Sequence, residues 1–290
     1  MIKKIFIIGT GLIGASTGLA LRATGFSGEI VGFDASAHEL ATAQSSGAID
    51  GFAHSRPEAL DLARTAEVIV LAIPVLAVLD WSELLAPVLN EQQLLTDTGS
   101  TKLQIATAAR RLFHQPGRAG FLPGHPMAGK ESGGASHAEA NLFRDAMWLF
   151  TPLEAAGAPP PLEAEWRTLV AGFGARTLDL DPTHHDELCA WVSHLPQMLS
   201  TALAALLEDT FGSDEKGRAE IAAIGGRALR ETTRLGASPY SMWRDIALTN
   251  TQPLADTLLA LEQRLQHLRE NLRTPELREQ FALANRFRSR

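Results

Sequence analysis

Short apolar runs that stop at glycine, aspartate or proline recur along the first half of the chain, and they constrain its fold more than any other feature. The runs occupy residues 3–9 (KKIFIIG), 29–34 (EIVGFD), 67–74 (EVIVLAIP), 93–100 (QLLTDTGS) and 120–126 (GFLPGHP). The first and third are continuously apolar, which is typical of strands buried on both faces. Helical patterns separate the runs, the first of them over residues 12–23. The sequence therefore predicts an α/β domain with a doubly wound, Rossmann-type parallel sheet.

The regular alternation of strand and helix patterns is lost in the second half of the chain. Two further strand patterns, at residues 146–152 and 175–182, are followed by sequence that is almost wholly helical in pattern. We therefore place a boundary near Asp181, between a dinucleotide-binding domain of residues 1–181 and an all-helical domain of residues 182–290.

The helical half carries a long apolar stripe. Its members recur with 4-3-4-3-4 spacing: Leu188, Val192, Leu195, Leu199, Ala202 and Leu206. We expect them to form one buried face of a long helix, which Pro196 kinks near His194. Further helices are expected over residues 220–235, 241–249, 253–271 and 276–287. Apolar stripes of this extent exceed what one small domain hides, which favours a homodimer.

A glycine-rich turn joins the first predicted strand to the first predicted helix. It consists of Gly9, Thr10, Gly11, Leu12, Ile13 and Gly14. The glycines let the backbone approach a pyrophosphate, which rests on amides at the helix N-terminus. Asp34 ends the second strand, where it can accept hydrogen bonds from ribose hydroxyls and repel a 2′-phosphate, so NAD is predicted rather than NADP. The alternative is a glycine turn that only packs the helix against the sheet.

Two more strand ends are expected to flank the nicotinamide. Ala72 and Pro74 close one strand, and Thr98 and Ser100 follow another. Such sheets bind ligands at the edge where the carboxyl ends of their strands meet. The Ser100 hydroxyl can donate and accept a hydrogen bond, or it can cap the helix that follows, and these roles are compatible. The simplest interpretation of Lys102 is a solvated side chain.

The segment GHPMAGKESGG, residues 124–134, is too polar and too rich in glycine to contribute to a core. His125 lies among its glycines at a predicted strand end, a position that favours catalysis over a structural role. The segment is predicted to be a loop that presents His125 and then folds over bound substrate. His184 and His185, in contrast, are expected at the exposed start of a helix that Asp181 caps.

Composition narrows the classes of partner. The net charge is −7 and no run of lysine or arginine occurs, which argues against nucleic acid or a membrane surface. The single Cys189 excludes an internal disulfide and favours a cytoplasmic location. The start of the chain imitates a signal peptide, but glycines interrupt its apolar run and no stretch is long enough to span a bilayer.

Six stretches of the sequence, taken in order, resemble the prephenate and arogenate dehydrogenase family of tyrosine biosynthesis. They are GTGLIG, DTGSTK, GHPMAGKESGG, NLF, VSHLPQML and TRLGASPYSMWRDI, and the match covers residue 1 to about Ile246. The resemblance implies an NAD(P)-dependent oxidative decarboxylation of a cyclohexadienyl acid. It also implies that the helical domain forms a homodimer.

The resemblance assigns roles to residues in the middle of the chain. His125 matches the catalytic histidine of the family, and Ser100 matches the hydroxyl beside it. Glu131 matches an acidic residue near the mouth of the site. Lys130 departs from the family pattern and is a candidate for setting substrate preference.

The resemblance also implies two substrate-binding positions in the helical half, His194 and Arg234. For His194 the alternative is a helix histidine with its hydrogen bonds satisfied internally. Arg234 could instead form a surface ion pair with Glu231.

A reaction of this kind needs such groups. Hydride leaves C4 of the ring, which carries a hydroxyl, and loss of the C1 carboxylate as carbon dioxide makes the ring aromatic. A neutral imidazole can take the hydroxyl proton, and a guanidinium can clamp a carboxylate with two hydrogen bonds. No metal is required, because aromatisation drives the decarboxylation. Prephenate and arogenate, a keto acid and an amino acid, are both left open as substrates.

Two other classes of protein fit less well. A β-hydroxyacid dehydrogenase relies on a lysine in the helix after its α/β domain, and no lysine occurs between Lys130 and Lys216. A regulator that senses NAD without turnover would need a partner-binding domain, and the helical half has no basic cluster.

Overall fold

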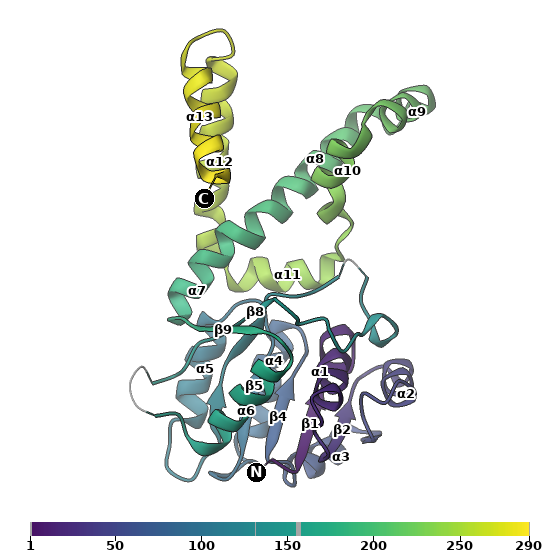
Figure 1. Cartoon of the computed structure of the whole chain (residues 1–290), viewed down its shortest axis with the longest axis vertical. Coiled ribbons are helices and arrows are strands. Elements are labelled where there is room, and N and C mark those ends of the chain that lie inside the picture. The colour runs from purple at the N-terminus through teal and green to yellow at the C-terminus, as the bar shows by residue number, and fades with distance from the viewer. Residues whose placement is uncertain (1, 131, 155–157, 290) are drawn as a thin grey trace.

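The structure, a computed structural model, describes residues 2–130, 132–154 and 158–289 and confirms an α/β unit followed by a helical one (Figure 1). A six-stranded sheet lies at the centre of the α/β unit, in the order β3-β2-β1-β4-β5-β6, and all its pairings are parallel. The strands are β1 (Lys4–Ile8), β2 (Glu29–Phe33), β3 (Gly51–Phe52), β4 (Val68–Leu71), β5 (Leu94–Asp97) and β6 (Gly120–Leu122). The strand order reverses between β1 and β4, which creates the crevice where such sheets bind ligands.

Helices cover both faces of this sheet. They are α1 (Leu12–Ala23), α2 (Ala37–Ser45), α3 (Arg56–Ala63), α4 (Val75–Leu85), α5 (Leu103–Phe113) and α6 (Pro161–Gly172). In β1, Ile5 and Ile7 share a core with α1, α2 and α6. Phe6 and Ile8 point the other way, into a core with α3, α4 and α5. The strand is therefore buried on both faces, as its continuous apolar sequence predicts.

A second sheet contains the histidine that the sequence singles out. Its strands are β7 (Gly124–Pro126), β8 (Met147–Phe150) and β9 (Arg176–Asp179). β7 runs antiparallel to β8, and His125 pairs with Leu149. The expectation that His125 lies in a loop is therefore wrong. Its polar, glycine-rich neighbourhood carries no strand signal, and the pairing is imposed by β8, whose Trp148 and Phe150 are anchored in the core.

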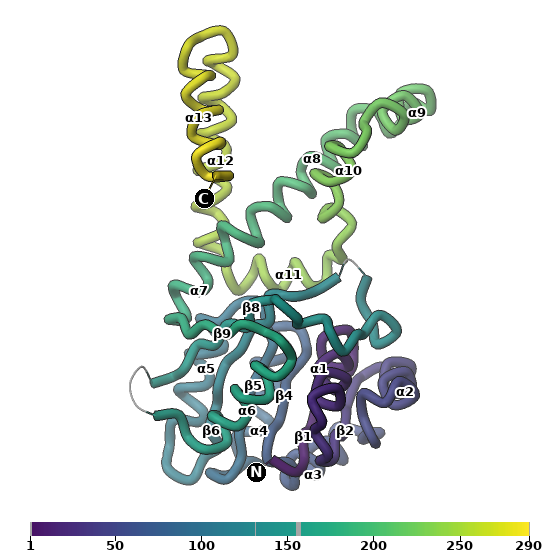
Figure 2. The backbone as a smooth tube through the Cα atoms, viewed as in Figure 1, coloured from purple at the N-terminus to yellow at the C-terminus, as the bar shows by residue number. Residues whose placement is uncertain are grey.

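The helical part consists of two helical arms and one helix that lies across the α/β unit. Its elements are α7 (Pro182–Cys189), the π-helical turn η2 (Ala190–His194), α8 (Leu195–Phe211), α9 (Glu215–Ile224), α10 (Gly226–Thr233), the 3₁₀ turn η3 (Arg234–Ala237), α11 (Tyr240–Thr249), α12 (Thr251–Glu270) and α13 (Glu276–Arg288). Figure 2 shows α8, α9 and α10 as one arm and α12 with α13 as the other, while α11 lies across the α/β unit. The helix expected over residues 220–235 is interrupted at Gly226, where φ is +58°. Among the described residues, none of the helices is both long and apolar enough to cross a membrane.

The apolar stripe of the helical half is exposed. Val192 and Leu206 keep 64% and 61% of their surface accessible, so this face is not buried within a single copy of the chain. The arm formed by α8 leaves the α/β unit, and a single copy of the chain has too few neighbouring elements to cover it (Figure 1). Where Pro196 is predicted to kink the helix, a π-helical turn ends at His194 and Pro196 lies in the first turn of α8.

Candidate active site

The glycine-rich turn combines packing with open space. A Cβ atom added at Gly9 would lie 2.3 Å from the carbonyl oxygen of Ala72, and one at Gly14 would lie 1.8 Å from that of Gly9. Gly9 also has a φ of +92°, which favours glycine. At Gly11, by contrast, no atom of the described chain comes within 4 Å beyond its own neighbours and helix. Two glycines thus pack the turn against β4 and α1, while Gly11 leaves room for a ligand at the N-terminus of α1, where Leu12 and Ile13 follow.

Asp34 is held at the side of this turn. Its carboxylate accepts hydrogen bonds from the amide of Thr10 at 2.8 Å and from the amide of Ser36 at 2.9 Å. The residue is only half-buried, and its carboxylate can accept more hydrogen bonds than these two. Because Thr10 adjoins Gly11, the carboxylate lies beside that open space, where a ribose would need an acceptor.

The residues predicted to flank the nicotinamide lie at the carboxyl ends of two neighbouring strands. They are Ala72, Pro74, Thr98 and Ser100. The amide of Ala72 donates to Ile8 at 2.7 Å, and that of Thr98 donates to Leu71 at 3.1 Å. These bonds continue the ladders between β1, β4 and β5, so the two segments leave the sheet at the same edge as the glycine-rich turn.

The segment after β5 is built around a buried ion pair. The Lys102 ammonium contacts the Asp97 carboxylate, and both side chains are fully buried. Burial lowers the pKa of Lys102 and raises the pKa of Asp97. In each case the charge of the partner shifts the pKa in the opposite direction. Two interpretations of the sequence are wrong here, since Lys102 is not solvated and Ser100 does not cap the helix. Instead, Asp186 of α7 accepts hydrogen bonds from the amides of Lys102 at 2.7 Å and Leu103 at 2.9 Å.

His125 is the first member of a buried hydrogen-bonded chain. Its Nδ1 lies 2.9 Å from Nε2 of His185, and Nδ1 of His185 lies 2.8 Å from Oδ1 of Asp186. The amide of Gly124 donates to Oδ1 of Asp97 at 3.1 Å, which ties β7 to the carboxyl end of β5. The structure thus places His125 beside the strand ends assigned to the nicotinamide.

The direction of the hydrogen bonds determines the tautomers. Asp186 accepts two backbone hydrogen bonds as a carboxylate, so Nδ1 of His185 donates to it. Nε2 of His185 then has only a lone pair, and it accepts from Nδ1–H of His125. The remaining nitrogen of His125, Nε2, is left as the unprotonated one. Within the described part of the chain, His125 makes its polar contacts through Nδ1 alone.

Burial keeps the imidazoles of the site neutral. It lowers the pKa of His125 well below its usual value, and the charges of His185, Lys102 and His194 lower it further. Burial also lowers the pKa of His185, although the hydrogen bond to Asp186 opposes the shift. The pKa of His194 is lowered to about 4, again mainly by burial. A neutral His125 at ordinary pH is a proton acceptor.

The roles of His185 and Asp186 are not among those predicted from the sequence. His185 is expected at an exposed helix start, but its side chain is fully buried against His125. Asp181 does cap α7, since its carboxylate accepts from the amides of Thr183 and His184. His184 is exposed as predicted. Helical spacing is the one signal in the sequence for the burial of His185, because His185 and Cys189 lie one turn apart and both face the core.

His194 lies on the buried side of the π-helical turn. The Asn250 amide nitrogen donates to its Nδ1 at 3.1 Å, so the ring proton of His194 is on Nε2. The ring stands edge-to-face to Trp243, with 5.8 Å between centroids. Nε2–H is therefore a fixed donor, and its orientation is set by two elements that are remote in sequence.

Arg234 lies exposed at the start of η3. Gln197, one turn after His194, donates to the carbonyl of Leu235 at 2.7 Å, which fastens η3 to α8. Glu231 accepts a hydrogen bond from Arg227 at 2.6 Å. The residue after Arg234 is thereby held against the helical turn that follows His194.

The segment after β7 is tied to the dinucleotide-binding helices. The amide of Ala135 donates to Glu39 of α2 at 2.5 Å, and the amide of Glu139 donates to Ser16 of α1 at 3.0 Å. The Lys130 ammonium contacts Glu139 at 2.5 Å and donates to the carbonyl of His137 at 2.8 Å, so it braces the segment. Glu131 lies outside the described residues. Closure of the segment over substrate stays a prediction.

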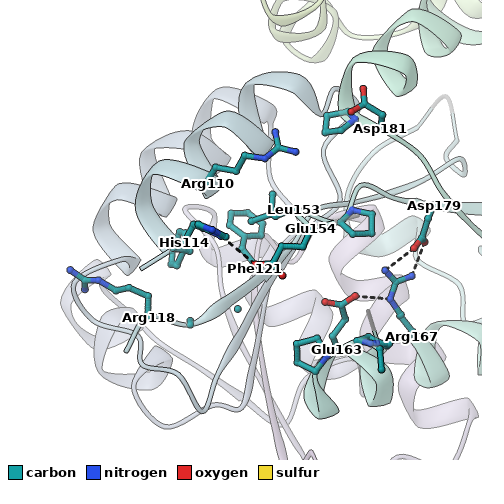
Figure 3. Close-up of a pocket in the computed structure, with 18 of the residues that line it drawn as sticks. Arg110, His114, Arg118, Phe121, Leu153, Glu154, Glu163, Arg167, Asp179 and Asp181 are labelled. Carbon is teal, nitrogen blue, oxygen red and sulfur yellow. Dashed lines mark hydrogen bonds and ion pairs between the residues drawn. The ribbon is translucent and has the colours of Figure 1, made fainter. Parts of the chain in front are cut away.

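A separate pocket of about 710 Å³ lies between α5, α6 and β9 (Figure 3). None of the predicted site residues lines it. Arg167, on one side of the pocket, points toward both Glu163 and Asp179 and pairs with them at 2.9 and 2.7 Å. Because the predicted site residues gather elsewhere, the chemistry is assigned to the edge of the sheet near His125.

Comparisons with known proteins agree with this arrangement. Residues 17–177 match a family model described as the nucleotide-binding domain of prephenate dehydrogenase, and residues 181–285 match its dimerization domain. A prephenate dehydrogenase of Lactococcus lactis is 34% identical over 92% of this chain and 70% of its own length.

Two solved structures resemble the chain over nearly its whole length. Prephenate dehydrogenase from A. aeolicus, in complex with hydroxyphenyl propionate and NAD⁺, has a TM-score of 0.84 at 26% identity and covers 100% of this chain and 96% of its own. Arogenate dehydrogenase from Synechocystis has a TM-score of 0.77 at 29% identity and covers 99% of each chain. The likeness includes the helical arms as well as the α/β unit.

Proposed function

Because the chain belongs to the prephenate dehydrogenase family, we propose that it oxidises a cyclohexadienyl acid with NAD and releases carbon dioxide. Prephenate would give 4-hydroxyphenylpyruvate, and arogenate would give tyrosine. In either case, hydride passes from C4 of the ring to the cofactor, and the electrons of the C1 carboxylate bond enter the ring as carbon dioxide leaves.

One observation carries the assignment of the base. The chain from Asp186 through His185 to His125 leaves Nε2 of a neutral, buried His125 unprotonated beside the end of β5. Nε2 takes the C4 hydroxyl proton as hydride departs, which makes a carbonyl at C4. Once decarboxylation turns that carbonyl into a phenolate, the imidazolium returns the proton. His125 therefore ends the reaction in its starting protonation state, and the only products besides the aromatic one are NADH and carbon dioxide.

His185 and Asp186 support both stages of this proton transfer. Before reaction they hold the His125 ring in the productive tautomer. While His125 is protonated, the Asp186 carboxylate, reached through His185, favours its positive charge. Lys102 cancels the charge of Asp97, so that the site does not carry a second uncompensated carboxylate.

The other predicted residues bind and orient. Ser100 would hold the ring hydroxyl near His125, and Nε2–H of His194 would donate to the substrate. Arg234 would clamp a substrate carboxylate with two hydrogen bonds. The described contacts of Lys130 lie within its own segment, so it would support that segment, and a role in substrate preference stays a prediction.

NAD would lie along the edge formed by β1, β4 and β5. Its pyrophosphate would rest above Gly11 on the N-terminus of α1, and Asp34 would accept from the adenosine ribose. Ala72, Pro74, Thr98 and Ser100 would line the nicotinamide side.

The helical part would pair two copies of the chain. A match to the dimerization domain of the family and the exposed stripe of α8 support a homodimer. We place the domain boundary near Asp181, between the last strand and α7, and the enzyme in the cytoplasm, which suits its single, free cysteine.

The decisive experiment uses the purified protein with NAD. Prephenate and arogenate are supplied separately, NADH is followed by absorbance, and released carbon dioxide is measured in parallel. At least one substrate should yield both products in equal amounts. Failure to reduce NAD with either substrate would overturn the proposed function.

A further inference from the structure

Cys189 completes a triangle of ligand atoms with the two histidines of the hydrogen-bonded chain. Its Sγ lies 3.6 Å from Nε2 of His185 and 4.0 Å from Nδ1 of His125, and the two nitrogens are 2.9 Å apart. All three side chains are buried. Tetrahedral zinc, with Zn–N of about 2.0–2.1 Å and Zn–S of about 2.3 Å, holds such ligand atoms roughly 3.3–3.6 Å apart. Each edge of the triangle is within about 0.5 Å of that requirement.

A second observation points to the same ligand. Nδ1–H of His185 donates to Asp186, which aims the lone pair of Nε2 into the triangle. A carboxylate that receives the far N–H is the usual support of a metal-bound histidine. Asp186 is itself fixed by the amides of Lys102 and Leu103. One thiol and two neutral imidazoles select zinc or cadmium over magnesium or calcium.

We propose that His125, His185 and Cys189 form a Zn²⁺ site that inhibits this enzyme by removing its base. The inhibition, though not the binding, rests on the proposed function. The reaction itself needs no metal, so the site would act as a control on the reaction and not as part of it.

The proton count gives the mechanism of inhibition. In the free protein, Nδ1 of His125 holds the proton that bridges the two rings. A metal ion bound to both nitrogens takes the place of this proton, which moves to Nε2 of the same ring. Nε2 then cannot accept the substrate hydroxyl proton. The metal lies on the Nδ1 side of the ring, away from the substrate, so kcat should fall while KM stays nearly constant.

Metal binding also releases the thiol proton. Burial raises the pKa of Cys189 to about 12, so the thiol is protonated across the neutral range. The metal-bound thiolate has lost this proton, so zinc should bind more tightly as the pH rises. The other titratable groups that face the triangle are Asp97, Lys102, Asp186 and His194.

The test compares the unmodified protein with Cys189→Ala and with a matched control, His184→Ala. His184 lies on the same helix but is exposed. Each protein is freed of metal, titrated with Zn²⁺ or Mg²⁺, and assayed for NAD reduction. Cd²⁺ binding is followed separately through thiolate-to-metal charge-transfer absorption. Zinc should inhibit the unmodified protein and His184→Ala reversibly, with chelator restoring activity, and magnesium should not.

The Cys189→Ala variant provides the decisive comparison. Its activity without metal should be unchanged, and inhibition should need more than roughly 100-fold more zinc, because losing a ligand exceeds the 10–100-fold cost of losing an outer partner. Equal zinc sensitivity of this variant, or no cadmium–thiolate absorption in the unmodified protein, would overturn the site. Cadmium binding at Cys189 without loss of turnover would leave the site in place and refute His125 as the base.

Discussion

Replacing His125 by asparagine isolates its role as a base. The asparagine amide nitrogen stands the same number of bonds from Cβ as Nδ1 of histidine, and it can donate to Nε2 of His185 in the same way. The buried hydrogen-bonded chain therefore stays satisfied, and the strand pairing of β7 does not depend on the side chain. What is lost is Nε2, the atom that accepts the proton.

The magnitude follows from that single loss. A positioned general base contributes about 10²–10⁴-fold, which corresponds to about 2.7–5.5 kcal/mol of transition-state stabilisation. The kcat of His125→Asn should fall by this factor, whereas KM and the affinity for NAD should change little. Stopped assays of NADH formation at saturating substrate measure kcat, and fluorescence titration measures NAD binding.

The pH profile provides an independent check. Only the neutral imidazole is a base, so kcat should fall as the pH drops through the pKa of His125. Because burial holds that pKa well below its usual value of 6.5, turnover should persist at mildly acidic pH and decline only below it. The acid limb should be absent from His125→Asn. His184→Asn, changed at an exposed histidine, should show the unmodified profile.

Two results would refute this reasoning. A His125→Asn protein with near-normal kcat would show that another group takes the proton. An acid limb centred at or above the usual histidine pKa would show that the ring is not held neutral by burial.

Three further predictions concern the cofactor, the substrate and stability. Asp34→Ser should narrow the preference for NAD over NADP, measured as the ratio of kcat/KM, and equal use of both cofactors by the unmodified protein would contradict the assignment. Arg234→Ala should raise the substrate KM sharply without changing NAD affinity. Arg234→Lys should recover only part of the lost substrate affinity, because a point charge cannot make a two-pronged contact. An unchanged KM in the alanine variant would show that Arg234 has a structural role. Lys102→Met leaves the buried Asp97 without its counter-charge, so the free energy of unfolding by denaturant should fall by about 3–5 kcal/mol, against about 0.5 or less for the exposed Lys216→Met.

The sequence determined those parts of the protein that depend on neighbouring residues. A run such as residues 67–74 can bury both faces only as an inner strand, and the structure has β4 there. Gly9 and Gly14 are required by the contacts of one tight turn, which local spacing reveals. Asp34 follows the next strand, whose parallel pairing with β1 brings it back to that turn. The fold and the dinucleotide edge were therefore predictable.

Tertiary structure decided how the remaining polar residues are used. Lys102 and His185 have charged or polar neighbours in sequence and give no sign of burial, yet each is enclosed by elements that come from far along the chain. Asp186 caps α5 from α7, a role that no pattern around Leu103 reveals. The stripe through Leu206 shows the reverse case, since helical spacing marks an apolar face but not which chain covers it. Whether a side chain is buried, and which protonation state it keeps, depends on which segments pack against it in three dimensions. Periodicity along one segment does not identify the segment that packs against it.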